Sequence, residues 1–193
     1  MSDVKWLGQR ISYKRTDEEL TVIITQQVSR LNTLLMMGWV AAWLAIGVVV
    51  SVFWMNTEAE SDRLFFSIFM AFWAYFFVRV IKVLAWRLIG KEMIRVFDHQ
   101  MTIKNAYGTY GKARFFDTEN IKKLGPINYD ETKFFQFMER APWIIGAETI
   151  GFEYLRNRVT FGKQLESKEA LQLARIVDKA IKEIPARAQR KKS

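Results

Sequence analysis

The sequence contains no cysteine and only one histidine, and these absences exclude several kinds of site. Without cysteine, neither a disulfide bond nor a metal site with thiolate ligands can form. His99 alone cannot assemble a typical zinc site, which needs several nitrogen or sulfur ligands. The lack of cysteine also fits a reducing compartment.

Motifs for phosphate binding and catalysis are missing as well. The glycines of the Tyr107–Gly111 segment do not follow a G-x-G-x-x-G spacing, and no Gly-Lys-Ser/Thr sequence occurs. Asp117 with Glu119, and Asp130 with Glu131, are close pairs of carboxylates, but acids in turns are usually solvated surface groups. We therefore expect a protein that is not an enzyme and that carries no metal or other cofactor.

Two long uncharged apolar runs are the strongest positive signal in the chain. They extend from Leu34 to Trp54 and from Leu64 to Val78. A helix of about 20 residues crosses a hydrocarbon core of ~30 Å. The runs therefore predict a transmembrane helical hairpin at residues 34–88, with helices at 34–54 and 64–86 and an external loop at 55–63.

The charges that flank the two runs differ in sign. The loop carries Glu58, Glu60 and Asp62, whereas the far end of the second run is basic. Because basic residues favour the cytoplasmic side, we expect a multi-pass protein with both termini in the cytoplasm. The basic residues expected near the lipid headgroups are Arg79, Lys82, Arg87, Lys91 and Arg95.

Arg79 and Lys82 allow two interpretations because they lie close to the predicted span. From Leu64, Arg79 lies about 22 Å along a helix, which is short of a full crossing. Long basic side chains can keep their stems in lipid while their charges reach the headgroups. The alternative is a functional charge within the membrane. Its partner would then come from another subunit, because the first span has no carboxylate.

After the second span the hydrophobic period changes from helical to two, which is typical of strands. Strands are predicted around residues 94–96 and 101–103, with a turn at Asp98-His99. Further short strands are expected at 113–116 and 121–124, and Gly125-Pro126 is expected to end that stretch. A hairpin at 149–155 and 158–161, around Arg156-Asn157, completes the predicted strands.

A helix near the carboxyl end is predicted to cap these strands. Ser167 is a candidate N-cap, and Pro185 is expected to end the helix after Ile184. Its apolar residues recur at intervals of three and four, at Ala170, Leu173, Ala174, Val177, Ile181 and Ile184. A cytoplasmic domain is thus expected at 89–185. A basic tail at 186–193 would follow, either solvated or near an anionic leaflet.

The segment before the first span, residues 1–33, has two interpretations. Thr16 and Glu19 have the spacing of a helix capping box, which would start a helix at Leu20. In the alternative, residues 10–14 and 20–25 form a β-hairpin that joins the cytoplasmic domain. The β-branched residues after Leu20 favour the hairpin, with a helix from about Val28 that runs into the membrane.

The 128–147 segment is unusually apolar for a solvated connection. It can be interpreted as a short helix that closes the domain, as a loop that dips into the membrane interface, or as a surface that binds a partner. The residues that would bind a partner are Phe134, Phe135, Phe137, Trp143 and Ile144.

Three segments together resemble a known family: Tyr13–Ile24, Trp86–Lys104 and Gly151–Ala174. In the last, Phe152-Glu153-Tyr154 leads through Val159-Thr160-Phe161-Gly162 to a helix with Glu169-Ala170. With the membrane hairpin, this order resembles bacterial pleckstrin-homology-like (PH-like) membrane proteins. The resemblance implies an α+β membrane protein of the bacterial inner membrane, with a small antiparallel β-barrel or sheet capped by a C-terminal helix. It implies no enzymatic activity, and the 128–147 segment departs from the pattern.

Two functions fit these features and the net charge of +9. The first is a non-enzymatic scaffold, an accessory or assembly subunit of a membrane protein complex that binds protein, or a second copy of itself, through its cytoplasmic domain and hairpin. The second is recognition of anionic lipid or another anionic ligand at the membrane surface. A membrane tether argues against nucleic acid as the partner.

Overall fold

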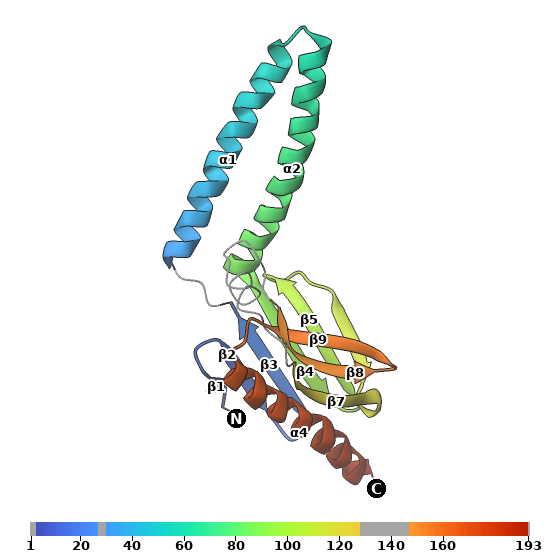
Figure 1. Cartoon of the computed structure of the whole chain (residues 1–193). Coiled ribbons are helices and arrows are strands. Elements are labelled where there is room, and N and C mark those ends of the chain that lie inside the picture. The colour runs from blue at the N-terminus through green and yellow to red at the C-terminus, as the bar shows by residue number, and fades with distance from the viewer. Residues whose placement is uncertain (1–2, 27–29, 128–146, 193) are drawn as a thin grey trace. The chain divides into compact units, whose positions relative to one another are not determined.

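The computed structural model describes residues 3–26, 30–127 and 147–192, with side chains described as far as Arg187. The chain divides into two compact units. One is Val28–Leu88, and the other combines Met1–Gln27 with Ile89–Ser193. Two helices are therefore inserted, in sequence, into an α+β unit (Figure 1).

The first unit is a pair of helices, α1 (Arg30–Asn56) and α2 (Glu60–Ile89), of 27 and 30 residues. Both are long and apolar enough to cross a membrane, and almost none of their apolar residues are buried. The predicted spans 34–54 and 64–86 lie inside them. The connection is residues 57–59, shorter than the predicted 55–63, because α1 ends later and α2 begins earlier than predicted. Glu60 and Asp62 stabilise its first turn, where the helix dipole favours acids.

A tryptophan pair joins α1 to α2. The Trp73 Nε1–H donates to the Trp43 carbonyl oxygen at 2.9 Å, and the Trp43 Nε1–H donates to the Trp73 carbonyl oxygen at 3.5 Å. The Trp73 ring covers Gly47, where an added Cβ would lie 2.2 Å from a ring carbon. Close approach of the helices here therefore requires a glycine.

The α+β unit contains a six-stranded antiparallel sheet in which each strand pairs with its neighbour in the sequence. The strands are β1 (Lys5–Leu7), β2 (Ile11–Arg15), β3 (Glu19–Thr25), β4 (Gly90–Phe97), β5 (Gln100–Tyr107) and β6 (Ala113–Asp117). β3 and β4 pair from Glu19↔Phe97 to Thr25↔Lys91, although α1 and α2 separate them in the sequence. β1 was not predicted, whereas the turn at Asp98-His99 is confirmed.

The N-terminal β-hairpin is confirmed, and the helix alternative is wrong. The Thr16 Oγ1 accepts a hydrogen bond from the Glu19 N–H at 3.0 Å, which is the contact that a capping box would make. The Thr16 N–H, however, donates to the Glu19 carbonyl oxygen at 2.8 Å and closes a turn between β2 and β3. The same local bond serves either structure, and pairing of β3 with β4 selects the strand.

A second sheet follows a short 3-10 helix, η1 (Thr118–Asn120). It contains β7 (Ile121–Pro126), β8 (Glu148–Tyr154) and β9 (Asn157–Lys163), in that order. Among the described strands no pairing joins the two sheets, so they do not close into a barrel. Residues 128–146 lie outside the described part of the chain, and with them all five predicted partner-binding residues.

Two predicted boundaries in this sheet are wrong by a few residues. β7 includes Gly125 and ends at Pro126, two residues after the predicted last strand residue, Leu124. A proline is tolerated there because β7 is an edge strand, where the missing N–H breaks no ladder hydrogen bond. The β8–β9 turn is centred on Leu155-Arg156, one residue earlier than predicted, and both residues have positive φ.

The last helix, α4 (Ser167–Lys192), contacts β3, β4, β7 and β8. One buried cluster unites side chains of both sheets with the predicted apolar face of α4. It includes Leu20, Ile94, Ile103, Ile150, Phe152, Phe161, Leu173 and Val177. The unit therefore has a hydrophobic core of its own.

Pro185 does not end α4 as predicted, and residues 186–192 are helical. Ion pairs beyond the proline stabilise the extra turns. Arg187 pairs with Asp17 of the β2–β3 turn and, at 3.5 Å, with Glu183 one turn earlier. The segment predicted as a tail is therefore continuous with the helix that covers the sheets.

Candidate functional site

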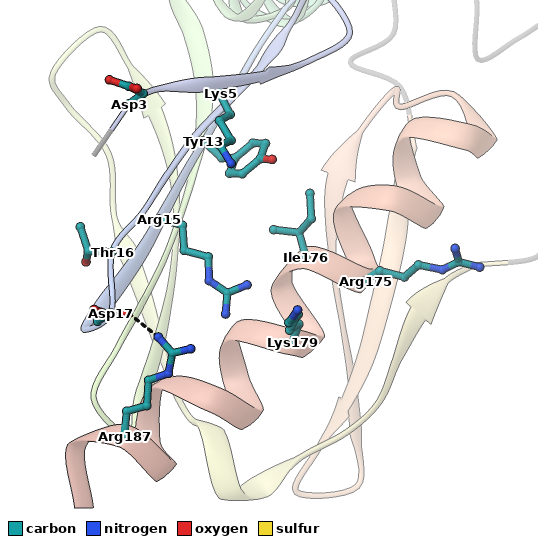
Figure 2. A pocket seen from close by; sticks show the side chains of 10 residues that line it. All are labelled: Asp3, Lys5, Tyr13, Arg15, Thr16, Asp17, Arg175, Ile176, Lys179 and Arg187. Carbon is teal, nitrogen blue, oxygen red and sulfur yellow. Dashed lines mark hydrogen bonds and ion pairs between the residues drawn. The ribbon is translucent and has the colours of Figure 1, made fainter. Parts of the chain in front are cut away.

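A concavity of the α+β unit that is lined mostly by charged residues lies between its N-terminal strands and α4. This cleft, of about 920 Å³, is called the α4 cleft below. Figure 2 shows its walls, with side chains of β1, β2 and the following turn on one side and α4 on the other. It is lined by Asp3, Lys5, Tyr13, Arg15, Thr16, Asp17, Arg175, Ile176, Lys179 and Arg187.

The α4 cleft is electropositive, with five basic lining residues against two acidic ones. Three of the cations are paired with carboxylates: Arg15 with Glu183 at 2.7 Å, Lys179 with Glu183 at 3.7 Å, and Arg187 with Asp17. Such partly exposed pairs are worth about 0–1 kcal/mol each. These pairs orient side chains of the two walls, but each contributes little to stability.

Lys5 and Arg175 are the remaining cations of the cleft. Neither forms an ion pair with a described residue, and both are exposed. Lys5 is on β1 and Arg175 on α4, and Tyr13 and Ile176 line the cleft with them; in Figure 2 the Arg175 side chain extends away from β1. The arrangement combines unpaired positive charge with a small apolar floor, which suits an anionic group attached to an apolar or extended segment.

A buried polar junction on Glu92 connects the two sheets behind this surface. Glu92 belongs to β4 and is fully buried. Its Oε2 accepts hydrogen bonds from the backbone N–H groups of Gly162, at 2.8 Å, and Lys163, at 3.2 Å, both in β9. Gly162 has φ +76°, a left-handed conformation that glycine adopts readily, and this conformation presents its N–H to the carboxylate.

Several polar side chains surround the same junction. The Asn105 amide, oriented by its hydrogen bonds, donates from Nδ2 to Glu92 Oε1 at 3.3 Å and accepts from the Lys163 Nζ at 3.1 Å. Lys163 lies 3.8 Å from Glu148, which is hydrogen-bonded to Thr160. The Arg10 Nη2 donates to the Lys163 carbonyl oxygen at 2.7 Å. The β1–β2 turn, β4, β5, β8 and β9 therefore meet in one polar network.

Burial controls the charges at this junction. It raises the pKa of Glu92, and the hydrogen bonds from Lys163 and Gly162 oppose that shift only in part. Burial likewise lowers the pKa of Arg10, against the attraction of Glu169 and Glu166. No cavity adjoins Glu92 among the described pockets, so its arrangement supports the packing of the sheets. In the described part of the chain no three acids or histidines are placed to hold a metal ion.

The predicted headgroup residues occupy two different elements. Lys91 and Arg95 project from the outer face of β4, opposite to buried Glu92 and Ile94. Arg95 donates to the Glu19 carboxylate at 2.6 Å and lies over the Phe97 ring, with its Cζ 5.4 Å from the ring centre. It is therefore partly engaged within the sheet. The remaining three, Arg79, Lys82 and Arg87, are on α2.

Neither the cleft nor the Glu92 junction was predicted from the sequence. The basic residues Arg175 and Lys179 are four apart on a helix, and this spacing is a signal for a basic face on α4. Nothing local indicates that Lys5 lines the same cleft, because β1 was not predicted. Glu92 belongs to β4 but precedes the strand predicted at 94–96, and its buried contacts come from β9 in the other sheet.

Comparison of this chain with protein-family models, with curated proteins and with solved structures finds no match.

Proposed function

We propose that this protein is a non-enzymatic, membrane-anchored scaffold that acts as an accessory or assembly subunit of a membrane protein complex. α1 and α2 cross the membrane as a hairpin, and the α+β unit is a PH-like module that binds a partner protein in the cytoplasm. The bacterial inner membrane fits the resemblance to PH-like membrane proteins.

The exposure of α1 and α2 supports the membrane hairpin in this proposal. Many of their large apolar side chains are more than half exposed, including Leu35, Phe65 and Phe72. Burying such a side chain is worth about 1.5–3 kcal/mol, so their joint exposure to water would be prohibitive. The α+β unit, in contrast, has its own core. A lipid environment for the helices satisfies both observations.

The ends of the helices support cytoplasmic termini. Glu58, Glu60 and Asp62 lie at the α1–α2 connection, whereas Arg79, Lys82 and Arg87 lie toward the other end of α2. This distribution follows the excess of basic residues found on cytoplasmic sides. The α+β unit would then lie in the cytoplasm with both termini.

We propose the α4 cleft as the place where an acidic segment of the partner binds. Its two cations without a carboxylate partner, Lys5 and Arg175, make charge-assisted hydrogen bonds available on β1 and α4. A protein partner suits the cleft because Tyr13 and Ile176 offer apolar contact in the same cleft.

Charge reversal in the cleft should release the partner. The double variant Lys5→Glu, Arg175→Glu is expected to lose most of a stoichiometric membrane partner that co-purifies with the wild type in mild detergent, because like charges would then oppose the acidic segment. Mass spectrometry of the purified complex measures the loss. The matched control is Lys122→Glu, Arg156→Glu, which reverses two exposed charges outside the cleft.

A third variant separates the cleft from the 128–147 segment. Phe134, Phe135 and Trp143 are replaced together by serine. If this variant loses the partner while the cleft variant retains it, the predicted apolar segment is the binding surface and the cleft is not. Retention by all variants would contradict partner binding at either surface.

Recognition of anionic lipid is the second candidate, favoured by Lys91 and Arg95 on one outer face of β4. It can be tested without the hairpin, because Thr25 and Lys91 are register partners across β3 and β4. A linker of about five Gly and Ser residues in place of residues 26–90 closes that hairpin. We expect a folded, soluble unit, since its core contains no residue of α1 or α2.

If lipid is the ligand, this unit sediments with vesicles of phosphatidylglycerol and phosphatidylcholine but not with phosphatidylcholine alone. Binding should fall steeply between low and physiological salt, because exposed charges are screened beyond about 8–10 Å. The Lys91→Glu, Arg95→Glu variant should not sediment. Binding that ignores salt would contradict this candidate.

A further inference from the structure

The turn between β5 and β6 adjoins the residue at which α2 ends. Ile89 is the last residue of α2, and Gly90 begins β4 without a linker. The Gly108 N–H donates to the Ile89 carbonyl oxygen at 2.9 Å, and Gly90 is the register partner of Tyr107. The last residue of α2 is therefore close to residues 107–112, which are called the tyrosine turn below.

The tyrosine turn holds an exposed aromatic ring in a fixed backbone. Tyr110 is 84% exposed, and its N–H and carbonyl oxygen exchange hydrogen bonds with Tyr107 at 3.1 and 2.7 Å. Gly111 approaches the strand so closely that a Cβ there would lie 2.3 Å from the Asn105 carbonyl oxygen. A ring of this size, held outward by a tight turn, is well placed to contact something outside the chain.

Basic side chains flank the ring. Lys104 donates from Nζ to the Thr109 carbonyl oxygen at 3.3 Å, and Lys112 is exposed. Tyrosine is enriched at membrane–water interfaces because its ring is apolar and its hydroxyl is polar. Lysine near an anionic leaflet is attracted to its headgroups. An exposed tyrosine ring between lysines therefore has the groups that favour contact with phospholipid headgroups.

The length of α2 places its end at the level of the headgroups. At 1.5 Å per residue, 30 residues extend about 45 Å, close to the ~40–45 Å of a bilayer with its headgroup regions. With Glu60 and Asp62 at one surface, Ile89 reaches the other. Its hydrogen bond to Gly108 holds the backbone of the tyrosine turn next to that residue.

We propose that the tyrosine turn is a second membrane contact, which seats Tyr110 among the phospholipid headgroups of the leaflet in which α2 ends. It restrains the α+β unit at the membrane surface, beyond the tether that the chain itself provides. This inference rests on the proposed membrane hairpin.

The absence of cysteine makes a direct test possible, because any introduced cysteine is a unique labelling site. Three variants of the full chain carry an environment-sensitive fluorophore, Thr109→Cys, Gln100→Cys and Phe72→Cys, in vesicles of phosphatidylglycerol and phosphatidylcholine. Gln100 is the matched control. It is exposed at the start of β5, the strand that leads into the tyrosine turn, and lies about 23 Å from Tyr107 along that strand. Phe72, on α2 and 63% exposed, reports on the hairpin.

We expect the probes at Phe72 and Thr109 to emit at shorter wavelength than the probe at Gln100. Lipids with a nitroxide on the headgroup should quench the Thr109 probe and not the Gln100 probe. Adding Tyr110→Ser should return the Thr109 probe toward the Gln100 spectrum, and the fold should survive because the ring is exposed.

The outcomes separate the inference from the proposed function. If Phe72 reports lipid while Thr109 matches Gln100, the membrane hairpin stands and the tyrosine turn contact is wrong. If Phe72 itself reports water, the hairpin is wrong and the inference falls with it. An unchanged Thr109 signal in the Tyr110→Ser variant would also overturn the role of the ring.

Discussion

Glu92→Ala is expected to destabilise the α+β unit by about 2–4 kcal/mol. The substitution removes the acceptor for the Gly162 and Lys163 N–H groups, and a buried donor without an acceptor costs about 1–3 kcal/mol. Thermal unfolding in detergent and hydrogen exchange of the β8–β9 peptides measure the loss. Exchange in β9 should rise most, because that strand loses its contact with β4.

Two substitutions control for this result. Glu153→Ala removes an exposed carboxylate on β8 that pairs with Lys123 at 2.9 Å, and it should change stability by less than about 0.5 kcal/mol. Glu92→Gln keeps an oxygen that can accept both N–H groups and should retain most of the stability. If Glu92→Ala matched Glu153→Ala, the junction would not hold the sheets together.

Glu92 should also give the protein a pH dependence of defined sign. Burial raises the folded-state pKa of Glu92 above the value of about 4.3 that the unfolded chain has. Below that value both states are protonated, and the carboxyl contributes its full stability. As pH rises toward the folded-state pKa, only the unfolded state releases the proton, so stability falls. The Glu92→Gln variant should lack this fall, and comparison of the two unfolding curves from pH 4 upward reveals it.

Gly47→Leu is expected to disrupt the α1–α2 hairpin. A Cβ at this position would lie 2.2 Å from the Trp73 ring, so either the ring or the helix must move. Overpacking of this kind costs about 1–3 kcal/mol, and the hydrogen bond from the Trp73 Nε1–H to Trp43 would be lost with it. The expected readout is a lower unfolding temperature in detergent, with greater protease sensitivity of the 57–59 connection.

The chain supplies a matched control at Gly38. No atom lies within 4 Å of a Cβ built there, so Gly38→Leu should leave the hairpin intact. Trp73→Ala should partly rescue Gly47→Leu, because it frees the space that leucine needs. A double-mutant cycle of Gly47 and Trp73 measures this coupling. Equal effects at Gly38 and Gly47 would show that helix contact is not what the substitution disturbs.

Elements with a strong local pattern were predicted well. The alternation around Arg95 and Thr102 located β4 and β5, and the three-and-four spacing from Ala170 located α4. Predicted boundaries were wrong where a contact between distant residues overrode a local sequence signal. Pro185 did not end α4 because Arg187 pairs with Asp17 in the β2–β3 turn, and Thr16 closes a hairpin because β3 pairs with β4.

The sequence by itself determined that the chain has two helices fit for a membrane and an α+β unit without cysteine chemistry. These follow from composition and short-range periodicity, which each segment carries alone. Only the tertiary structure decided that Lys5 and Arg175 line the same cleft, that Glu92 is buried between sheets, and that Gly108 binds the end of α2. Each of those contacts joins residues far apart in the sequence, so no local pattern encodes it.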